Sequence, residues 1–329
     1  VDFKCAGSWL ERSSYMAQHP TAIAAFMCMD GRVNVPLVTN TPRGIILPFR
    51  NLGGQFDLGW PHFGEVVAET VEEVTTQAHK LLAIITYHYS KGDSHRGCAG
   101  FNYDTAAARA HATQTVAQME SFFGRGRGIV YPLLCGLETD EDAIVFHGHN
   151  GQTLDLSTVQ SPDEDQLSIQ LGNLYPDMPH QMLRDLVPLA SRNVAHIAEI
   201  RGVNRGKDIE HCEWMICVGR GFDWLQMSNL ALIIGPYSPD LADPIVKAAG
   251  IIEGNMKAGR VPDDGFLVLS DAPYREIGLD RTRAELESAF LSKFAGDVIK
   301  SKFPELAKKM HVRAAVIDSH SREVEILKL

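Results

Sequence analysis

The sequence lacks any long apolar stretch. Its run from Leu81 to Tyr87 stops at His88, whereas a membrane-spanning helix needs about 18 to 20 consecutive apolar residues. The first 15 residues mix acidic and basic side chains, which does not match a secretory signal. We therefore expect a soluble protein with no membrane partner.

Basic side chains are also in short supply. The 31 Lys and Arg residues are outnumbered by 41 Asp and Glu residues, which gives a formal net charge of -10. Proteins that bind nucleic acid usually carry a basic patch or stripe. We therefore expect no nucleic-acid partner and look instead for a small-molecule substrate.

Cysteines are few and irregularly spaced. The chain has 6 of them in 329 residues, whereas small secreted domains held by disulfides have a denser framework. In a chain of this size they indicate reduced thiols or metal ligands. This favours a cytoplasmic location.

Two α/β units follow one another along the chain. In the first, we expect strands at 21–27, 44–49, 81–87 and 129–134, and helices at 62–80 and 104–123. The same order recurs with strands at 214–218, 230–234, 266–269 and 312–317, and helices at 239–259 and 281–310. We interpret this repeat as an ancient duplication.

The repeat predicts an α/β fold of two similar lobes, each with a mainly parallel sheet flanked by helices. A catalytic, metal-binding lobe is expected at 1–150, a polar and then helical connector at 151–211, and a degenerate second lobe at 212–329. Within this plan, the segment around Asn150-Gly151 predicts a hairpin turn. Asp163 to Asp165 predicts a solvated loop.

Two thiols and one imidazole come from strand ends in the first lobe. Cys28 ends one predicted strand, His88 ends another, and Cys98 lies in the loop after it. The carboxyl ends of parallel strands share one edge of the sheet, where such folds place their sites. Thiolate and imidazole are ligands that zinc prefers, and three protein ligands leave a fourth position for water. We expect a single metal site there.

The second lobe offers no such set. The positions that correspond to Cys28 and His88 fall at Val218 or Gly219 and near Asp271, and no thiol corresponds to Cys98. We therefore expect only the first lobe to hold a metal.

Asp30 and Arg32 follow Cys28 at intervals of two. In an extended segment this spacing points all three side chains to one side. A carboxylate held by a guanidinium beside a metal can accept a hydrogen bond from activated water and orient it.

These residues belong to a series of motifs between residues 26 and 100. In order, they are Cys-x-Asp-x-Arg at 28–32, Arg-Asn-x-Gly-Gly at 50–54, an apolar strand ending at 88, and Gly-Cys-x-Gly at 97–100. The series resembles the β-carbonic anhydrases. The resemblance implies one zinc ion on Cys28, His88 and Cys98, replaceable by cadmium or cobalt. It also implies Asp30 and Arg32 as catalytic residues in the reversible hydration of carbon dioxide to bicarbonate.

The chain departs from the family in the loop before Cys98. The usual His-x-x-Cys spacing nominates His95 as the ligand, whereas alignment of the apolar strand favours His88 and treats 89–96 as an insertion. The carboxysomal shell type of the family also lengthens this loop, and it fuses an active lobe to a degenerate one. The histidine that is not a ligand is a candidate proton shuttle near the mouth of the site.

Two other functions remain open on the same residues. One is hydrolysis of carbonyl sulfide or carbon disulfide, because a metal-activated water attacks any linear electrophile that fits. The other is a non-catalytic, zinc-stabilised scaffold. Whatever the function, a fused second lobe would make one chain a pseudo-dimer with one site. Such pseudo-dimers could associate further into homo-oligomers. The resemblance adds a bacterial microcompartment to the expected locations.

Overall fold

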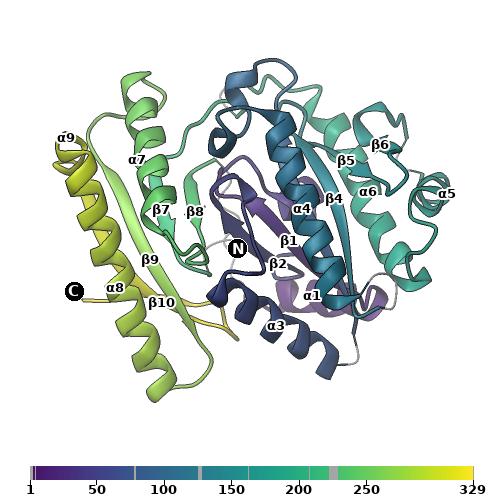
Figure 1. Ribbon diagram of the computed structural model, residues 1–329, viewed down its shortest axis with the longest axis horizontal. Helices are drawn as coiled ribbons and strands as arrows, with labels where there is room; N and C mark the ends of the chain where they lie inside the picture. Colours follow the sequence, from purple (N-terminus) through teal and green to yellow (C-terminus); the bar gives the residue numbers. More distant parts are fainter. Residues whose placement is uncertain are drawn as a thin grey trace.

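The computed structural model describes residue 3 and residues 5–77, 79–124, 128–161, 163–206, 208–221 and 229–328. Two β-sheets lie in adjacent halves of the molecule, each flanked by helices (Figure 1). Both sheets are mainly parallel. The predicted fold class is therefore confirmed.

The first sheet has the strand order β2-β1-β3-β4-β5-β6. Its strands are β1 (Ala22–Cys28), β2 (Ile46–Asn51), β3 (Leu81–Tyr89), β4 (Val130–Glu138), β5 (Ala143–His147) and β6 (Thr153–Asp155). Strands β2, β1, β3 and β4 pair in parallel, and β5 and β6 add an antiparallel hairpin at the edge opposite β2. The hairpin turn predicted at Asn150-Gly151 is confirmed, and β6 extends this sheet beyond the predicted end of the lobe at residue 150.

The second sheet has the strand order β11-β10-β9-β7-β8. Its strands are β7 (Met215–Val218), β8 (Ala231–Ile234), β9 (Phe266–Tyr274), β10 (Met310–Asp318) and β11 (Val324–Ile326). The order β8-β7-β9-β10 reproduces β2-β1-β3-β4, with parallel pairing in both. This shared topology supports the interpretation of the repeat as a duplication.

Helices cover the sheets and fill the connector. They are α1 (Ala6–Gln18), α2 (Val35–Val38), α3 (Pro61–Thr76), α4 (Thr105–Phe123), α5 (Glu164–Leu174), α6 (His180–Ile200), α7 (Ala242–Lys257), α8 (Leu279–Lys302) and α9 (Pro304–Ala307). Short 3₁₀ turns are η1 (Leu52–Gly54), η2 (Ser94–Arg96), η3 (Ala99–Phe101) and η4 (Leu156–Thr158). Helix α4 packs on β3 and β4, and α8 packs on β9 and β10.

Two acidic residues show how these helices begin. Asp104 accepts a hydrogen bond from the amide of Ala107 and caps α4, as predicted. Asp163 accepts from the amides of Asp165 and Gln166 and caps α5. The residues predicted as a solvated loop at 163–165 are exposed, but Glu164 and Asp165 belong to the first turn of α5 rather than to a loop. An aspartate ahead of a helix satisfies amides that have no partner within the helix. The predicted last turn of the helix at 62–80 includes Ala78, which lies outside the described residues.

The two halves meet through the main chain at their adjacent sheet edges. The amide of Ile233 donates to the carbonyl of Met29 (2.9 Å), and the amide of Gly235 donates to the carbonyl of Arg50 (2.8 Å). The amide of Asn229 donates to the carbonyl of Gly31 (2.8 Å). The second half thus contacts the segment that follows β1.

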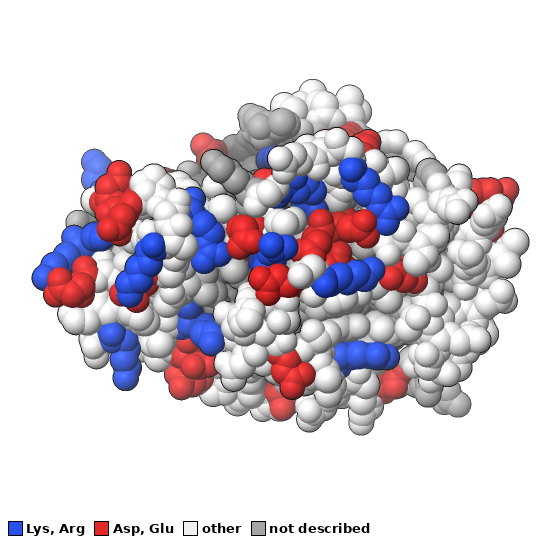
Figure 2. Space-filling model, turned by 90° about the horizontal axis from the view of Figure 1, so that it is seen from above, with Lys and Arg blue, Asp and Glu red and all other residues white. Residues whose placement is uncertain are grey.

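Among the described helices, none combines the length and apolarity that a bilayer span requires. On the face drawn in Figure 2, basic and acidic side chains are interspersed, without a broad stripe of either sign.

Candidate metal centre

Three potential ligands converge at the carboxyl edge of the first sheet. Cys28 is the last residue of β1, His88 is the penultimate residue of β3, and Cys98 directly precedes η3. One ligand atom from each lies within 4.8 Å of the others. All three side chains are buried, with exposed fractions of 4%, 1% and 2%. The structure thus brings together residues that are 70 positions apart.

The donor set fits a single divalent ion. Neither ring nitrogen of His88 has a hydrogen-bond partner among the described residues, although buried polar atoms are nearly always paired. Burial, and then the neighbouring Cys98, raise the pKa of the Cys28 thiol. The hydrogen bond with Cys28 lowers the pKa of Cys98. Two sulfurs and an otherwise unpartnered imidazole are a set that zinc prefers.

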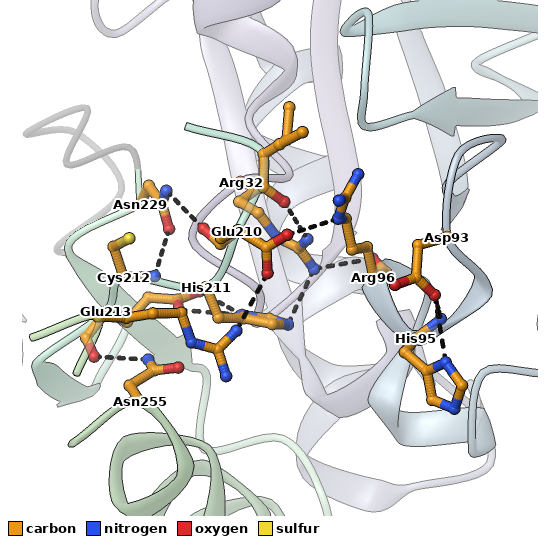
Figure 3. A network of polar contacts seen from close by, with 12 residues as sticks. Arg32, Asp93, His95, Arg96, Glu210, His211, Cys212, Glu213, Asn229 and Asn255 are labelled. Carbon is orange, nitrogen blue, oxygen red and sulfur yellow. Dashed lines mark hydrogen bonds and ion pairs between the residues drawn. The ribbon is translucent and has the colours of Figure 1, made fainter. Parts of the chain in front are cut away.

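The alternative histidine lies elsewhere. The side chain of His95 is 80% exposed, and its Nδ1 atom lies 3.2 Å from the Asp93 carboxylate. Figure 3 shows this pair directed away from Arg32. The geometry therefore favours His88 over His95 as the third ligand.

Glycines allow the loops around the centre to pack closely. Gly54 has a φ of +64°, and a Cβ atom there would lie 3.2 Å from the carbonyl of Thr86 and 3.5 Å from the amide of Cys28. A Cβ atom on Gly100 would lie 2.7 Å from the Cα atom of Gly53. Side chains at these positions would separate the strand ends that carry the ligands.

Asp30 and Arg32 form a bidentate ion pair beside the three ligands. Arg32 donates from Nε to Asp30 Oδ1 (3.0 Å) and from Nη2 to Oδ2 (2.6 Å). Asp30 Oδ2 also lies 3.8 Å from His88 Nε2. Burial alone would raise the pKa of Asp30, but the charge and hydrogen bonds of Arg32, together with the nearby His211 and His88, outweigh burial and hold this pKa well below its usual range.

The predicted reason for this pairing was wrong. Strand β1 ends at Cys28, and a turn follows in which the amide of Arg32 donates to Asp30 Oδ1 (2.9 Å). An aspartate readily accepts from the main chain two residues ahead. The turn, rather than the alternation of an extended strand, brings the two side chains together.

The second half contributes two residues that the sequence did not predict. His211 Nε2 lies 2.9 Å from Arg32 Nη2, and His211 Nδ1 lies 2.9 Å from Glu213 Oε2 (Figure 3). Glu213 Oε1 accepts a hydrogen bond from the amide of Gly31 (3.1 Å). These residues lie far downstream of the motifs. The only signal for them was the expectation that the second lobe stands in for a partner subunit.

A second set of potential ligands overlaps this network. One atom each of Asp30, His211 and Glu213 lies within 4.8 Å of the others. However, the guanidinium of Arg32 donates to both Asp30 and His211. Because a cation would meet this fixed positive charge, we interpret the set as a hydrogen-bond network rather than a metal site.

The second lobe does not repeat the ligand set. His88 is the eighth residue of the nine-residue strand β3, and Pro273 is the eighth residue of the nine-residue strand β9. Phe26 and Val218 pair with the fifth residues of these strands, so the counterpart of Cys28 lies two positions beyond Val218, at Arg220. The sequence placed the counterpart of Cys28 at Val218 or Gly219, and the structure places it at Arg220. It placed the counterpart of His88 near Asp271, and the structure places it at Pro273. Neither proline nor arginine offers a ligand atom at neutral pH.

Part of the chain is similar in sequence to known proteins. A family model described as "Carboxysome Shell Carbonic Anhydrase, catalytic domain" matches residues 60–202. The chain is similar to carboxysome shell carbonic anhydrases over part of its length. The carboxysome shell carbonic anhydrase of Hydrogenovibrio crunogenus is 26% identical over 247 residues, which cover 64% of this chain and 46% of the relative. That of Halothiobacillus neapolitanus is 28% identical over 197 residues, which cover 50% and 38%.

The chain thus spans less than half the length of these carboxysome shell carbonic anhydrases. A solved structure, "The structure of the beta-carbonic anhydrase CcaA", aligns with 46% of this chain and 91% of its own, with 15% identity and a TM-score of 0.34. The matched family region contains His88 and Cys98, whereas Cys28, Asp30 and Arg32 precede it.

Proposed function

We propose that this protein is a zinc-dependent carbonic anhydrase that interconverts carbon dioxide and bicarbonate. The observation that carries the proposal is the buried cluster of Cys28, His88 and Cys98, in which both nitrogens of His88 lack a partner among the described residues. These three residues would hold the ion. When bound, zinc supplies the Lewis acidity that makes water nucleophilic near neutral pH.

Asp30 and Arg32 are the proposed catalytic residues. An ionised Asp30 can only accept hydrogen bonds. It would therefore orient a water molecule by accepting a hydrogen bond from one O–H group of that water. Its depressed pKa keeps it in this ionised form at neutral pH. Arg32 occupies both carboxylate oxygens and leaves Asp30 one orientation.

The two-lobed architecture supports a pseudo-dimer with one working site per chain. The second lobe has the same strand order as the first, and its main chain bonds to the segment after β1. The names of the relatives favour a location in a carboxysome shell, a bacterial microcompartment. Both statements are proposals for this chain.

The test combines metal analysis with stopped-flow hydration of carbon dioxide. We expect one zinc ion per chain and rapid turnover, with both lost in His88→Ala. His95→Ala is the matched control, because this exposed histidine lies outside the cluster, and it should retain the metal. Loss of metal in His95→Ala but not in His88→Ala would refute the assignment.

The same assay separates the alternative functions. Faster turnover of carbonyl sulfide than of carbon dioxide would identify a hydrolase of sulfur analogues. Bound metal without turnover of either, together with unchanged folding of Asp30→Ala, would identify a zinc-stabilised scaffold. Either result would overturn the proposed carbonic anhydrase activity.

A further inference from the structure

Glu213 is a buried carboxylate from the second half that reaches the site of the first half. Its exposed fraction is 0%. Its Oε1 atom accepts from the amide of Gly31 (3.1 Å). His211 Nδ1 lies between the two oxygens, 2.9 Å from Oε2 and 3.1 Å from Oε1. Glu213 therefore contacts both the main chain of the Cys-x-Asp-x-Arg turn and the imidazole beside it. Buried acids with this degree of pairing are typically retained for a specific geometry.

The contacts of His211 define which ring nitrogen carries the proton. Arg32 Nη2 lies 2.9 Å from His211 Nε2. A guanidinium can only donate hydrogen bonds, so Nε2 must accept, and the proton of the neutral ring lies on Nδ1. Glu213 accepts that proton in a hydrogen bond. The carboxylate thus holds His211 in the tautomer whose Nε2 atom can accept a hydrogen bond from Arg32.

Arg32 carries this constraint to Asp30. The two hydrogens of its Nη2 atom are shared among three acceptors, Asp30 Oδ2 (2.6 Å), the carbonyl of Arg96 (2.9 Å) and His211 Nε2 (2.9 Å). Its Nη1 atom donates to the carbonyl of Ile209 (2.9 Å). Two of these acceptors come from the second half of the chain, and a rotated guanidinium would lose them. Figure 3 shows the guanidinium of Arg32 between His211 and Arg96.

We propose that Glu213 is a positioning residue for the proposed reaction. It acts through the tautomer of His211 on Arg32, and through the amide of Gly31 on the turn that carries Asp30. This inference rests on the proposed function. It adds that the lobe without metal ligands supplies a carboxylate on which turnover depends.

The sharpest variant is Glu213→Gln, which keeps the size and shape of the side chain. Its Oε1 atom can still accept from the amide of Gly31, while its NH₂ group replaces Oε2, the oxygen closer to His211 Nδ1 (2.9 Å against 3.1 Å for Oε1), and needs an acceptor there. His211 would move its proton to Nε2, opposite the donating Nη2 of Arg32. We expect kcat to fall by about tenfold to a hundredfold with KM and zinc content unchanged, as for other groups that orient a metal site indirectly.

Glu138→Gln is the matched control. Glu138 is also 0% exposed, and it accepts from the amides of Lys91 and Glu141, each at 2.9 Å. It has no contact with the Asp30 network among the described residues. Its kcat should stay within about twofold of wild type, since it makes none of the contacts that orient Arg32.

The tautomer of His211 is a readout that does not depend on activity. In protein labelled with ¹⁵N-histidine, with His211→Gln used to assign the signals, the wild type should show a protonated Nδ1 and an accepting Nε2 at pH 8. In Glu213→Gln the two should exchange. A wild-type ring protonated at Nε2, or a tautomer unchanged by Glu213→Gln, would overturn the proposal even if that variant folds poorly.

Failure of the proposed function can be told apart from failure of this inference. Zinc-loaded wild-type protein without carbon dioxide turnover would refute the function, whereas the ring signals would still show whether Glu213 sets the tautomer. In an active wild type, Glu213→Gln with normal kcat would refute the positioning role alone.

Discussion

Gly31→Ala tests whether the second lobe is part of the site. Gly31 lies between the two proposed catalytic residues, and a Cβ atom there would lie 2.8 Å from the carbonyl of Ala231. It would also lie 3.1 Å from the Cα atom of Asn229 and 3.1 Å from Cγ of Glu213. All three contacts come from the second half, and two are with the main chain. The added methyl group must therefore push the turn and the second lobe apart.

The expected cost follows from crowding alone. Gly31 does not have the left-handed backbone conformation that disfavours other residues, so alanine causes no conformational strain. Overpacking a rigid contact costs about 1 to 3 kcal/mol. The same shift would lengthen the hydrogen bonds from Gly31 to Glu213 and from Asn229 to Gly31 (3.1 and 2.8 Å), each worth about 1 kcal/mol. We expect Gly31→Ala to lose about 2 to 3 kcal/mol of stability. Displacement of Asp30 should separately lower kcat by at least about tenfold, which corresponds to about 1.4 kcal/mol in the activation barrier.

The assay is urea unfolding of the metal-loaded protein combined with stopped-flow hydration. Gly254→Ala is the control, because Gly254 lies within α7 with nothing within 4 Å of an added Cβ atom. Alanine is favoured over glycine inside a helix by about 0.5 to 1 kcal/mol, so this variant should be as stable as wild type or more stable. If Gly31→Ala matched wild type in both stability and kcat, the second lobe would not restrain the turn and the reasoning would fail.

Other predictions concern single residues. Asp30→Asn should retain zinc and lose about a hundredfold or more in kcat, measured by stopped flow, because it removes an acceptor that acts on the reacting water; normal turnover would exclude a catalytic role. Asp163→Ala should lower the free energy of unfolding by about 1 kcal/mol through loss of the α5 cap, with kcat unchanged. Burial lowers the pKa of His147 to about 4, below its value in the unfolded chain, so the unfolded state binds more protons and stability falls as the pH drops from about 6.5 towards 4. Between pH 7 and 5 this contribution is about 2 kcal/mol. His147→Gln should flatten that slope in urea titrations, and an unaltered slope would disprove the assignment.

Most of the fold could be predicted from periodicity. Strands buried on both sides read as continuous apolar runs, and all eight predicted strands lie within a few residues of observed ones. Edge strands were harder to predict. Strands β6 and β11 have only three residues each and are partly exposed, so no apolar run marks them. Helix α1 is mostly exposed and likewise gave little signal.

The ligand cluster was predictable because strand ends in a parallel sheet meet. Cys28 and His88 end neighbouring strands, and the pairing of β1 with β3 fixes their proximity. The contacts of Arg32 and its turn with His211 and Glu213 could not be predicted from strand ends. His211 and Glu213 lie 179 and 182 residues from the groups that they contact, in a segment without a motif. Only the packing of one lobe on the other brings them to the site.

Main-chain contacts link the second half of the molecule to the proposed site. Four main-chain groups next to the proposed site, the amide and carbonyl of Gly31 and the carbonyls of Met29 and Arg50, have partners in the second half. At about 1 kcal/mol each, these bonds are a sizeable fraction of the 5 to 15 kcal/mol that typically stabilises a domain. A first lobe without the second would lose this order in the turn that holds Asp30. The second half therefore holds the turn beside the proposed site, although Arg220 and Pro273 stand at the positions that correspond to Cys28 and His88.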